Sequence, residues 1–251
     1  IAREITLVET QQLPLALVDA QPGDVITLAP GVYRYSGRAL TVHRAGLLDA
    51  PITLRAAQPR TVTLEFDMLE GFHVSAPHWI FENLTIVGIC NKHSDCAHAF
   101  HVVGAATHVV IRNNVLRDFN AHIKINGAGG SYPDRGRIQN NQLYNTSARN
   151  TDAPVTPIDL VAANGWLIEE NLIADFIKLR GDGISYGAFA KGGGQDNVFA
   201  RNLVLCEHRL RGTPGRRVGL SLGGGGSDPR ACRDGRCAVE QERGVLRDNL
   251  I

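Results

Sequence analysis

The feature that most constrains this sequence is an asparagine that recurs about every 30 residues. The aligned asparagines are Asn83, Asn114, Asn141, Asn171, Asn202 and Asn249. Their spacings are 31, 27, 30, 31 and 47 residues, and an aliphatic residue follows five of the six. A fixed period of this length is typical of solenoids, in which each repeat stacks on its neighbours. Asn tolerates left-handed backbone at a tight bend, and stacked amides can bond from coil to coil.

The composition favours an all-β solenoid. The chain has 27 Gly and a single Met, and short β-branched runs alternate with Gly, Asn and Asp. We expect one domain over residues 1–251, with a short amphipathic helix over 10–21 as an N-terminal cap and an inserted loop over 223–244. In that helix we expect Leu13, Leu17 and Val18 to share one face.

Two further segments resemble a known family. The segment Gln21–Tyr33 (QPGDVITLAPGVY) resembles an entry strand, and Ala50–Ala56 (APITLRA) resembles the strand that follows it. Together with the Asn repeats, they make the chain similar to the right-handed parallel β-helix of the pectate-lyase-like superfamily, and distantly to chondroitinase B and alginate lyase. The resemblance implies a single-stranded right-handed parallel β-helix. It does not fix an activity, because this fold carries lyases, hydrolases, epimerases and binding proteins.

The chain stops at Asn249-Leu250-Ile251, in the middle of a repeat unit. An open end of a β-helix exposes apolar side chains and free strand edges. We therefore expect a longer natural product, or another chain or self-association at that end.

Each coil can be read as three strands, and the alternation of the first strand predicts which side chains point outward. We expect Phe72, Phe100, Ile123, Ile158, Ile184 and Leu220 to share one inward column, and Val74, Val102, Ile125, Leu160, Tyr186 and Leu222 a second. The outward column between them reads His73, His101, Lys124, Asp159, Ser185, Ser221. Because neighbouring rungs lie about 4.8 Å apart, His101, Lys124 and Asp159 should be neighbours, with Asn126 beside them.

In the resembled superfamily this outward face is the substrate groove, and the loops around it form its walls. Our first hypothesis is a polysaccharide lyase that cleaves a uronate-containing chain by β-elimination. We expect Lys124 to be the base, His101 or Tyr132 to protonate the leaving oxygen, and Asp159 to orient Lys124. The candidate carboxylate clamps are Arg180, Arg209 and Arg211. The candidate substrate-binding residues are His73, Asn126, Tyr132, Arg135, Ser185, Lys191 and His208.

Calcium is a candidate cofactor, because alginate- and chondroitin-lyase relatives carry acidic calcium ligands near a Lys base. Here Asp159 and Asp182 are the candidate ligands. The sequence has no Glu-x-Glu segment shortly before Lys124, as that pattern would require.

Two alternatives stay open. A glycoside hydrolase needs two carboxyl groups about 5–10 Å apart, and Asp159 with Asp182 is the obvious pair. A non-catalytic glycan-binding or structural β-helix would instead use the outward column as a solvated ladder, with Lys124 and Asp159 as a plain cross-strand ion pair.

Charge and cysteines restrict partners and location. The formal net charge of +1 argues against a strongly basic nucleic-acid binder, and no run of about 18 apolar residues predicts a membrane span. We expect Cys90–Cys96 and Cys232–Cys237 disulfides with Cys206 left over, which suits a secreted or periplasmic protein. Free cytosolic thiols, or zinc bound near Cys90 and Cys96, are the alternatives.

Overall fold

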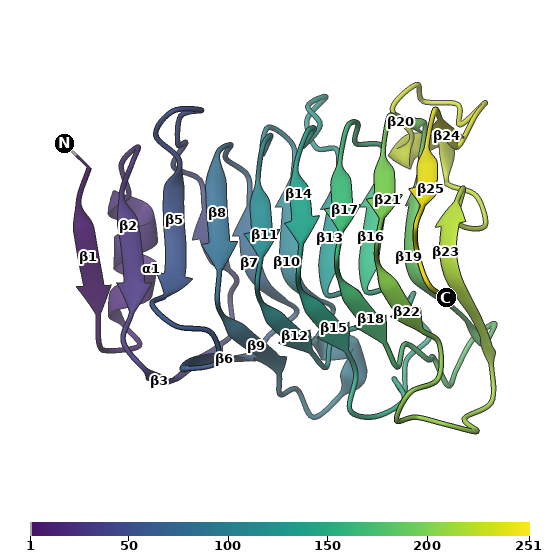
Figure 1. Cartoon of the computed structure of the whole chain (residues 1–251), viewed down its shortest axis with the longest axis horizontal. Helices are drawn as coiled ribbons and strands as arrows, with labels where there is room; N and C mark the ends of the chain where they lie inside the picture. Colours follow the sequence, from purple (N-terminus) through teal and green to yellow (C-terminus); the bar gives the residue numbers. More distant parts are fainter. Residues whose placement is uncertain (1) are drawn as a thin grey trace.

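The computed structural model, which describes residues 2–251, is a right-handed parallel β-helix of three long sheets (Figure 1). All named strand pairings are parallel, as a solenoid requires. Each full coil runs through one strand of every sheet, and the colours of Figure 1 advance steadily from one end to the other. The predicted all-β solenoid is confirmed.

The strands of the three sheets are short and stack in sequence order. Sheet 1 contains β1 (Glu4–Leu7), β2 (Val25–Leu28), β5 (Ile52–Ala56), β8 (Trp79–Glu82), β11 (Val110–Arg112), β14 (Arg137–Gln139), β17 (Leu167–Glu169), β21 (Val198–Ala200) and β25 (Val245–Arg247). Sheet 2 contains β3 (Gly31–Ser36), β6 (Val62–Asp67), β9 (Thr85–Gly88), β12 (Val115–Arg117), β15 (Gln142–Tyr144), β18 (Leu172–Ala174) and β22 (Leu203–Leu205). Sheet 3 contains β4 (Leu40–Val42), β7 (Glu70–Val74), β10 (His98–Val103), β13 (Ile123–Asn126), β16 (Ile158–Val161), β19 (Ile184–Lys191) and β23 (Arg216–Leu222).

The remaining elements lie between these strands. They are α1 (Gln12–Asp19), the 3₁₀ turns η1 (His93–Asp95) and η2 (Pro229–Ala231), and the pair β20 (Gly194–Gln195) and β24 (Gln241–Glu242). Helix α1 buries Leu13 and Leu17, and Figure 1 places it beside the first strands, consistent with a cap. Val18 is 44% exposed, so the expectation that it shares the buried face is wrong. Within residues 2–251 no helix is long and apolar enough to cross a membrane.

The asparagine ladder lies at the bend between sheet 1 and sheet 2. Asn114, Asn141, Asn171, Asn202 and Asn249 bond to one another in order, with amide contacts of 2.9–3.2 Å. Each Nδ2 also donates to a backbone carbonyl of the preceding coil, as Asn171 does to Ile138 O at 2.9 Å. At the bend, backbone N–H and C=O groups no longer pair with those of the next strand, and the asparagine side chains supply their hydrogen-bond partners instead.

Two details of the predicted ladder are wrong. Asn83 is not a rung, because its register position matches Asn113; Leu84 occupies the ladder position and donates its N–H to Asn114 Oδ1 at 2.9 Å. The left-handed backbone belongs to the residue before each rung, such as Asn113 (φ 58°) and Asn140 (φ 53°). The rung asparagines thus hold the coils together, while their predecessors make the turn.

The core consists of side-chain columns that run along the solenoid axis. Phe72 and Phe100 stack with ring centroids 5.2 Å apart, and the column continues through Ile123 and Ile158, all fully buried. In the next coil the register partner of Ile158 is Ala188 rather than the expected Ile184. Ala190 likewise takes the place predicted for Tyr186 in the second column.

Cysteines close two short loops. Cys90 and Cys96 form one disulfide, Cys232 and Cys237 form the other, and Cys206 is a free thiol. This is the predicted pairing. The zinc alternative near Cys90 is contradicted, because both sulfurs are used in the bridge.

Replacing a central rung of the ladder should destabilise the fold strongly. In Asn171→Ala, the N–H groups of Asn141 that now reach Asn171 Oδ1 lose a buried acceptor. We expect the free energy of unfolding in urea to fall by about 3 kcal/mol. Asn140→Gly is the matched control: it keeps the left-handed bend and loses one exposed side-chain bond. Equal losses in the two variants would contradict the structural role of the ladder.

Thiol titration of the denatured protein tests the disulfides. We expect one reactive thiol, from Cys206, before reduction and all five cysteines after it. Five reactive thiols without a reductant would contradict both bridges.

Candidate functional site

The outer face of sheet 3 carries a straight column of side chains, one from each rung. Register pairs His73 with His101, His101 with Lys124, and Lys124 with Asp159. The predicted neighbours are therefore confirmed. After Asp159 the column continues through Phe189 and Ser221.

Ser185 was predicted in this column, and that prediction is wrong. The side-chain alternation in β19 changes phase at Gly187, where an added Cβ would lie 2.5 Å from Gly219 O and 3.1 Å from Phe176 and Val204. Ser185 is consequently buried, and its Oγ accepts a hydrogen bond from Lys178 N at 3.0 Å. Phe189, four residues later, is the register partner of Asp159.

Lys124 and Asp159 form an ion pair at the centre of the column. Lys124 Nζ donates to Asp159 Oδ2 at 2.8 Å, and the side chains are 22% and 8% exposed. Asp159 Oδ1 is buried, and no group in residues 2–251 donates to it. A carboxylate accepts hydrogen bonds on both oxygens, so Oδ1 is a buried acceptor that Lys124 does not satisfy.

Two adjoining clefts open around this ion pair. The first is about 430 Å³ and is lined by Lys124, Asn126, Gly127, Ala128, Gly129, Gly130, Tyr132, Val161, Lys191, Gly226, Ser227, Asp228, Arg230, Ala231 and Cys232. The second is about 380 Å³ and is lined by Lys124, Pro154, Val155, Thr156, Asp159, Lys178, Asp182, Ile184, Tyr186, Phe189, Lys191, Gly224, Gly225 and Gly226. Lys124, Lys191 and Gly226 line both clefts, so they form the boundary between them.

Lysines concentrate at these clefts. The sequence has four lysines, all within the described residues, and three of them, Lys124, Lys178 and Lys191, line one or both clefts. The fourth, Lys92, lies in the exposed Cys90–Cys96 loop. Lysines that only solvate the surface would be expected to scatter over it rather than gather at two adjoining clefts.

Lys191 is half-buried at the boundary. Its Nζ donates to Gly226 O at 2.9 Å and lies 4.6 Å from the centre of the Phe189 ring. Burial lowers the pKa of Lys191, and the charge of Lys124 acts in the same direction, while Asp159 and Glu240 oppose the shift. Lys191 therefore loses its proton to give the neutral amine more readily than an ordinary surface lysine.

The wall of both clefts is the insertion that was predicted over 223–244. Glu240 secures it: its carboxylate accepts hydrogen bonds from Gly192 N, Ser227 N and Ser227 Oγ, each at 2.8 Å. Arg233 secures the other side with a two-pronged ion pair to Asp134 at 2.8 and 2.9 Å. Arg233 also lies 4.3 Å above the Tyr132 ring, which fixes that side chain in the first cleft.

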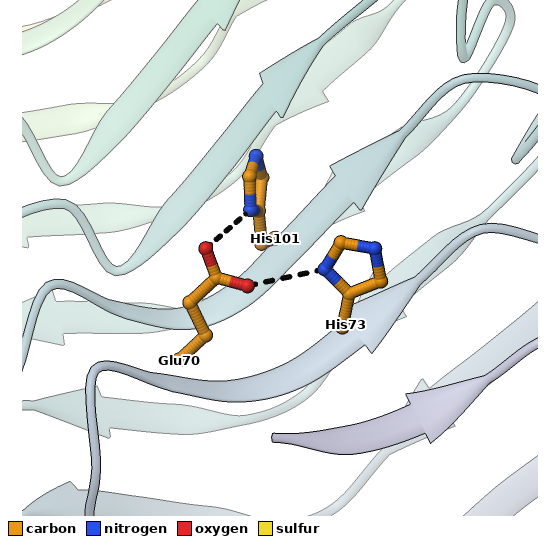
Figure 2. A group of neighbouring side chains, drawn as sticks. All are labelled: Glu70, His73 and His101. Atoms are coloured by element: carbon orange, nitrogen blue, oxygen red, sulfur yellow. Dashed lines mark hydrogen bonds and ion pairs between the residues drawn. The ribbon is translucent and has the colours of Figure 1, made fainter. Parts of the chain in front are cut away.

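A second cluster lies next to the clefts on the same face. Figure 2 shows Glu70 between His73 and His101. Glu70 Oε1 lies 2.7 Å from His101 Nδ1, and Oε2 lies 3.1 Å from His73 Nδ1. His101 Nε2 lies 2.7 Å from Asn126 Oδ1. His101 and His73 thus face Glu70, and neither lines the two clefts in the described part of the chain.

The arginines predicted as carboxylate clamps lie elsewhere. Arg180 pairs with Asp152 at 3.5 Å and lines a separate hollow with Lys92 and His93. Arg209 lies over the Tyr144 ring, and Arg211 bonds to His208 O in the loop after β22. Arg135 and His208 are exposed. Among residues 2–251 the lining of the two clefts includes none of these five side chains, although Asn126, Tyr132 and Lys191 are present as predicted.

The residues predicted to hold calcium do not fit that ion. Both Asp159 and Asp182 line the second cleft, but each carboxylate contacts a lysine ammonium, Lys124 at 2.8 Å and Lys178 at 2.6 Å. The hydrogen bond from Lys178 lowers the pKa of Asp182. Two carboxylates that are each neutralised by an ammonium leave little charge to attract a cation.

Several important residues were not among the predicted ones. Lys178, Asp228 and Arg230 line the clefts, Glu240 holds the wall, and Glu70 joins the two histidines. Glu70 had a usable signal, since it lies three residues before His73, at the start of the same strand. The others lie on loops, whose paths the strand pattern does not predict.

Comparison with known proteins shows the fold but no closer family. No family model matches the chain. It is 22% identical over 232 residues to pectate lyase L of Dickeya chrysanthemi, covering 78% of this chain and 52% of that protein. The chain therefore spans about half the length of the curated relative it matches.

Solved structures agree on the architecture. An alginate lyase from Paenibacillus sp. str. FPU-7 is similar with a TM-score of 0.54 at 20% identity, covering 80% of this chain and 76% of that one. Pectin methylesterase PemA from Erwinia chrysanthemi is similar with a TM-score of 0.57 at 13% identity, covering 82% and 66%. The chain thus has the pectate-lyase-like β-helix fold, as the resemblance implied.

Buried histidines around the site should make the fold sensitive to acid. Burial lowers the pKa of His98 and of His122 to about 4 each, whereas an unfolded histidine titrates near 6.5. As the pH falls from about 6.5 to 4, the unfolded chain binds protons that the folded chain does not, so unfolding becomes easier. Each histidine contributes a loss of up to about 3 kcal/mol.

Urea denaturation at several pH values checks this. In His122→Gln, the slope of unfolding free energy against pH in this window should fall by up to about 1.4 kcal/mol per pH unit. An unchanged slope would show that folding does not lower the pKa of His122.

Proposed function

We propose that this chain is a polysaccharide lyase that cleaves an acidic, uronate-containing polysaccharide by β-elimination in the two clefts of sheet 3. The observation that carries the proposal is the convergence of Lys124, Lys178 and Lys191 on these clefts. The lyase names of two similar proteins, pectate lyase L and the Paenibacillus alginate lyase, support it.

The charges of the clefts suit an anionic sugar chain. The first cleft carries Lys124, Lys191 and Arg230 against the single carboxylate of Asp228. The second carries three lysines against Asp159 and Asp182. Lys124, Lys178 and Arg230 are each paired with a carboxylate, so the positive excess of both linings rests on Lys191, in a chain whose net charge is +1. A local excess of positive charge in a concave site concentrates anionic ligands.

Elimination requires three actions: neutralisation of the uronate carboxylate, removal of the adjacent carbon-bound proton, and protonation of the leaving oxygen. The structure suggests a division of labour between two lysines. Lys124 is held by Asp159 and suits the role of a fixed positive charge against the uronate carboxylate, and Arg230, paired with Asp228, lines the same cleft. Lys191, whose pKa burial lowers, suits the role of base. This proposal moves the base from Lys124, where the sequence placed it, to Lys191.

The proton balance can be written through residues of the first cleft. Lys191 takes the proton from the carbon next to the carboxylate, a carbon–carbon double bond forms, and the bond to the leaving oxygen breaks. The Tyr132 hydroxyl, which lines the same cleft and now contacts Arg233 O at 3.3 Å, can protonate the leaving oxygen.

The hydrolase alternative has weaker support. A glycosidase needs one carboxyl group that keeps its proton as the general acid. Asp159 and Asp182 share a cleft, but each is paired with a lysine, and the pKa of Asp182 is lowered. The lowered pKa makes Asp182 a poor general acid.

The two disulfides also suit export. Disulfides persist in oxidising compartments. A polysaccharide substrate would likewise be met outside the cell. We therefore infer that the protein works outside the cytoplasm, secreted or periplasmic.

A depolymerisation screen with lysine variants tests the proposal. Alginate, pectate, chondroitin, heparin and hyaluronan are each incubated with the protein, with and without calcium. Ultraviolet absorbance of unsaturated uronates and reducing ends are followed together. We expect both to rise on at least one polymer, and Lys191→Ala to lower kcat by at least about 100-fold, as removal of a general base does. Lys92→Ala, which removes the lysine outside the clefts, should leave the rate unchanged.

The pH profile separates the two lysines. Activity should rise with pH as Lys191 loses its proton, with an apparent pKa below the ordinary lysine value of 10.5. Lys124→Ala should raise KM strongly and retain this rising limb, while Lys191→Ala should lose it. Loss of the limb in Lys124→Ala alone would return the role of base to Lys124.

Other outcomes decide between functions. Reducing ends without new absorbance would favour hydrolysis. Binding of an acidic polymer in calorimetry without either signal would favour a non-catalytic glycan-binding module. Both outcomes would overturn the lyase proposal.

A further inference from the structure

We propose that Glu70, His73 and His101 form a binding site for a divalent transition-metal ion of the zinc type, on the outer face of sheet 3 beside Lys124. The site is separate from the proposed lyase chemistry, and its occupancy can be tested without any substrate.

The three side chains converge from two adjacent strands, β7 and β10 (Figure 2). Their candidate ligand atoms, two imidazole nitrogens and a carboxylate oxygen, all lie within 4.8 Å of one another. Imidazole and carboxylate together are a donor set that suits zinc and its neighbours rather than calcium, which takes oxygen ligands. Two ligands on one tetrahedral zinc lie about 3.3 Å apart. His101 Nδ1 now contacts Glu70 Oε1 at 2.7 Å and His73 Nδ1 contacts the other oxygen, Oε2, at 3.1 Å. To reach the zinc spacing these two contacts would lengthen by about 0.6 and about 0.2 Å.

Hydrogen bonding at His101 supplies an independent reason for a cation. Asn126 Nδ2 donates to Gly127 O at 2.9 Å, which turns Asn126 Oδ1 toward His101 Nε2 at 2.7 Å. An amide oxygen only accepts, so Nε2 must carry the hydrogen. In a neutral ring, Nδ1 then has only a lone pair to offer Glu70, another acceptor, at 2.7 Å. At this separation an extra proton joins the two atoms, and a metal ion bound to both would replace that proton.

The surroundings favour this arrangement. The Asn126 bond to His101 is the kind of outer contact that orients a metal-binding histidine. The side chains are half-buried, 17% exposed at His101 and 36% at His73. Three protein ligands with access to solvent leave a fourth position for water or an anionic group of a ligand.

Titration with ZnCl₂ in a calorimeter, without substrate, tests the site. We expect one Zn²⁺ per chain and loss of that binding in His101→Ala and His73→Ala. His208→Ala removes an exposed histidine in the loop after β22 and should bind like the parent. Asn126→Leu should weaken binding roughly 10–100-fold by removing the contact that orients His101. If a histidine variant does not fold, Glu70→Gln keeps the shape of the side chain and removes its charge, and should also weaken binding at least tenfold.

Spectroscopy distinguishes the metal from the extra proton. With Co²⁺ in place of zinc, the intense visible bands of a four-coordinate ion should appear. In the Zn²⁺-bound protein, long-range ¹H–¹⁵N spectra should show His101 with hydrogen on Nε2 and metal on Nδ1. The proposal is overturned if zinc does not bind, if binding survives both His101→Ala and Glu70→Gln, or if His101 stays protonated on both nitrogens at saturating Zn²⁺. None of these results depends on lyase activity, so they leave the proposed function to its own test.

Discussion

Stacking of one coil on the next is the constraint on which the rest of this molecule depends. The strands are only three to eight residues long outside the two-residue pair β20 and β24, and strands this short do not hold a register alone. The buried amide ladder fixes it, because each rung bonds both to the next rung and to the backbone of the coil before it. Such groups in a low-dielectric interior are costly to leave unpaired, so a slipped coil would be penalised at every rung.

That register places the chemistry. Once the coils are locked, the side chain at one position of each rung must lie a strand spacing from its counterparts. His101, Lys124 and Asp159 are brought together in this way although they are 23 and 35 residues apart along the chain. A rigid sheet also holds these groups in place without the entropy that a flexible loop would lose on binding a ligand.

The loops complete what the sheet begins. Glu240 and Arg233 fasten the insertion over the outer face, and this encloses space beside Lys124 that a bare sheet would leave open. Enclosure also buries Lys191 and thereby changes its acid–base behaviour. Along the same face, an ion-paired lysine, a half-buried lysine and a carboxylate with two histidines lie on successive parts of one surface. The sheet thus offers two chemically different environments, one cationic and one suited to hold a cation.

The sequence was enough to predict the solenoid, its period, the disulfide pairs and the neighbours in the outward column. These follow from local alternation and from a repeat, both of which are written along the chain. The sequence did not show that Asn83 lies outside the ladder. Asn83 and Asn114 are both followed by an aliphatic residue, but Asn83 occupies the left-handed bend, as Asn113 does, while Asn114 is a rung. The position of Ser185 was also not predictable. Phe189, four residues later, is the register partner of Asp159, and a shift of four residues leaves the alternation of side chains unchanged. The change of phase at Gly187 occurs where the backbone packs closely against Phe176, Val204 and Gly219. Only the tertiary structure decided which loop residues reach the clefts. Lys178, Arg230 and Glu240 are placed by hydrogen bonds and ion pairs with distant segments, and no periodicity records those contacts.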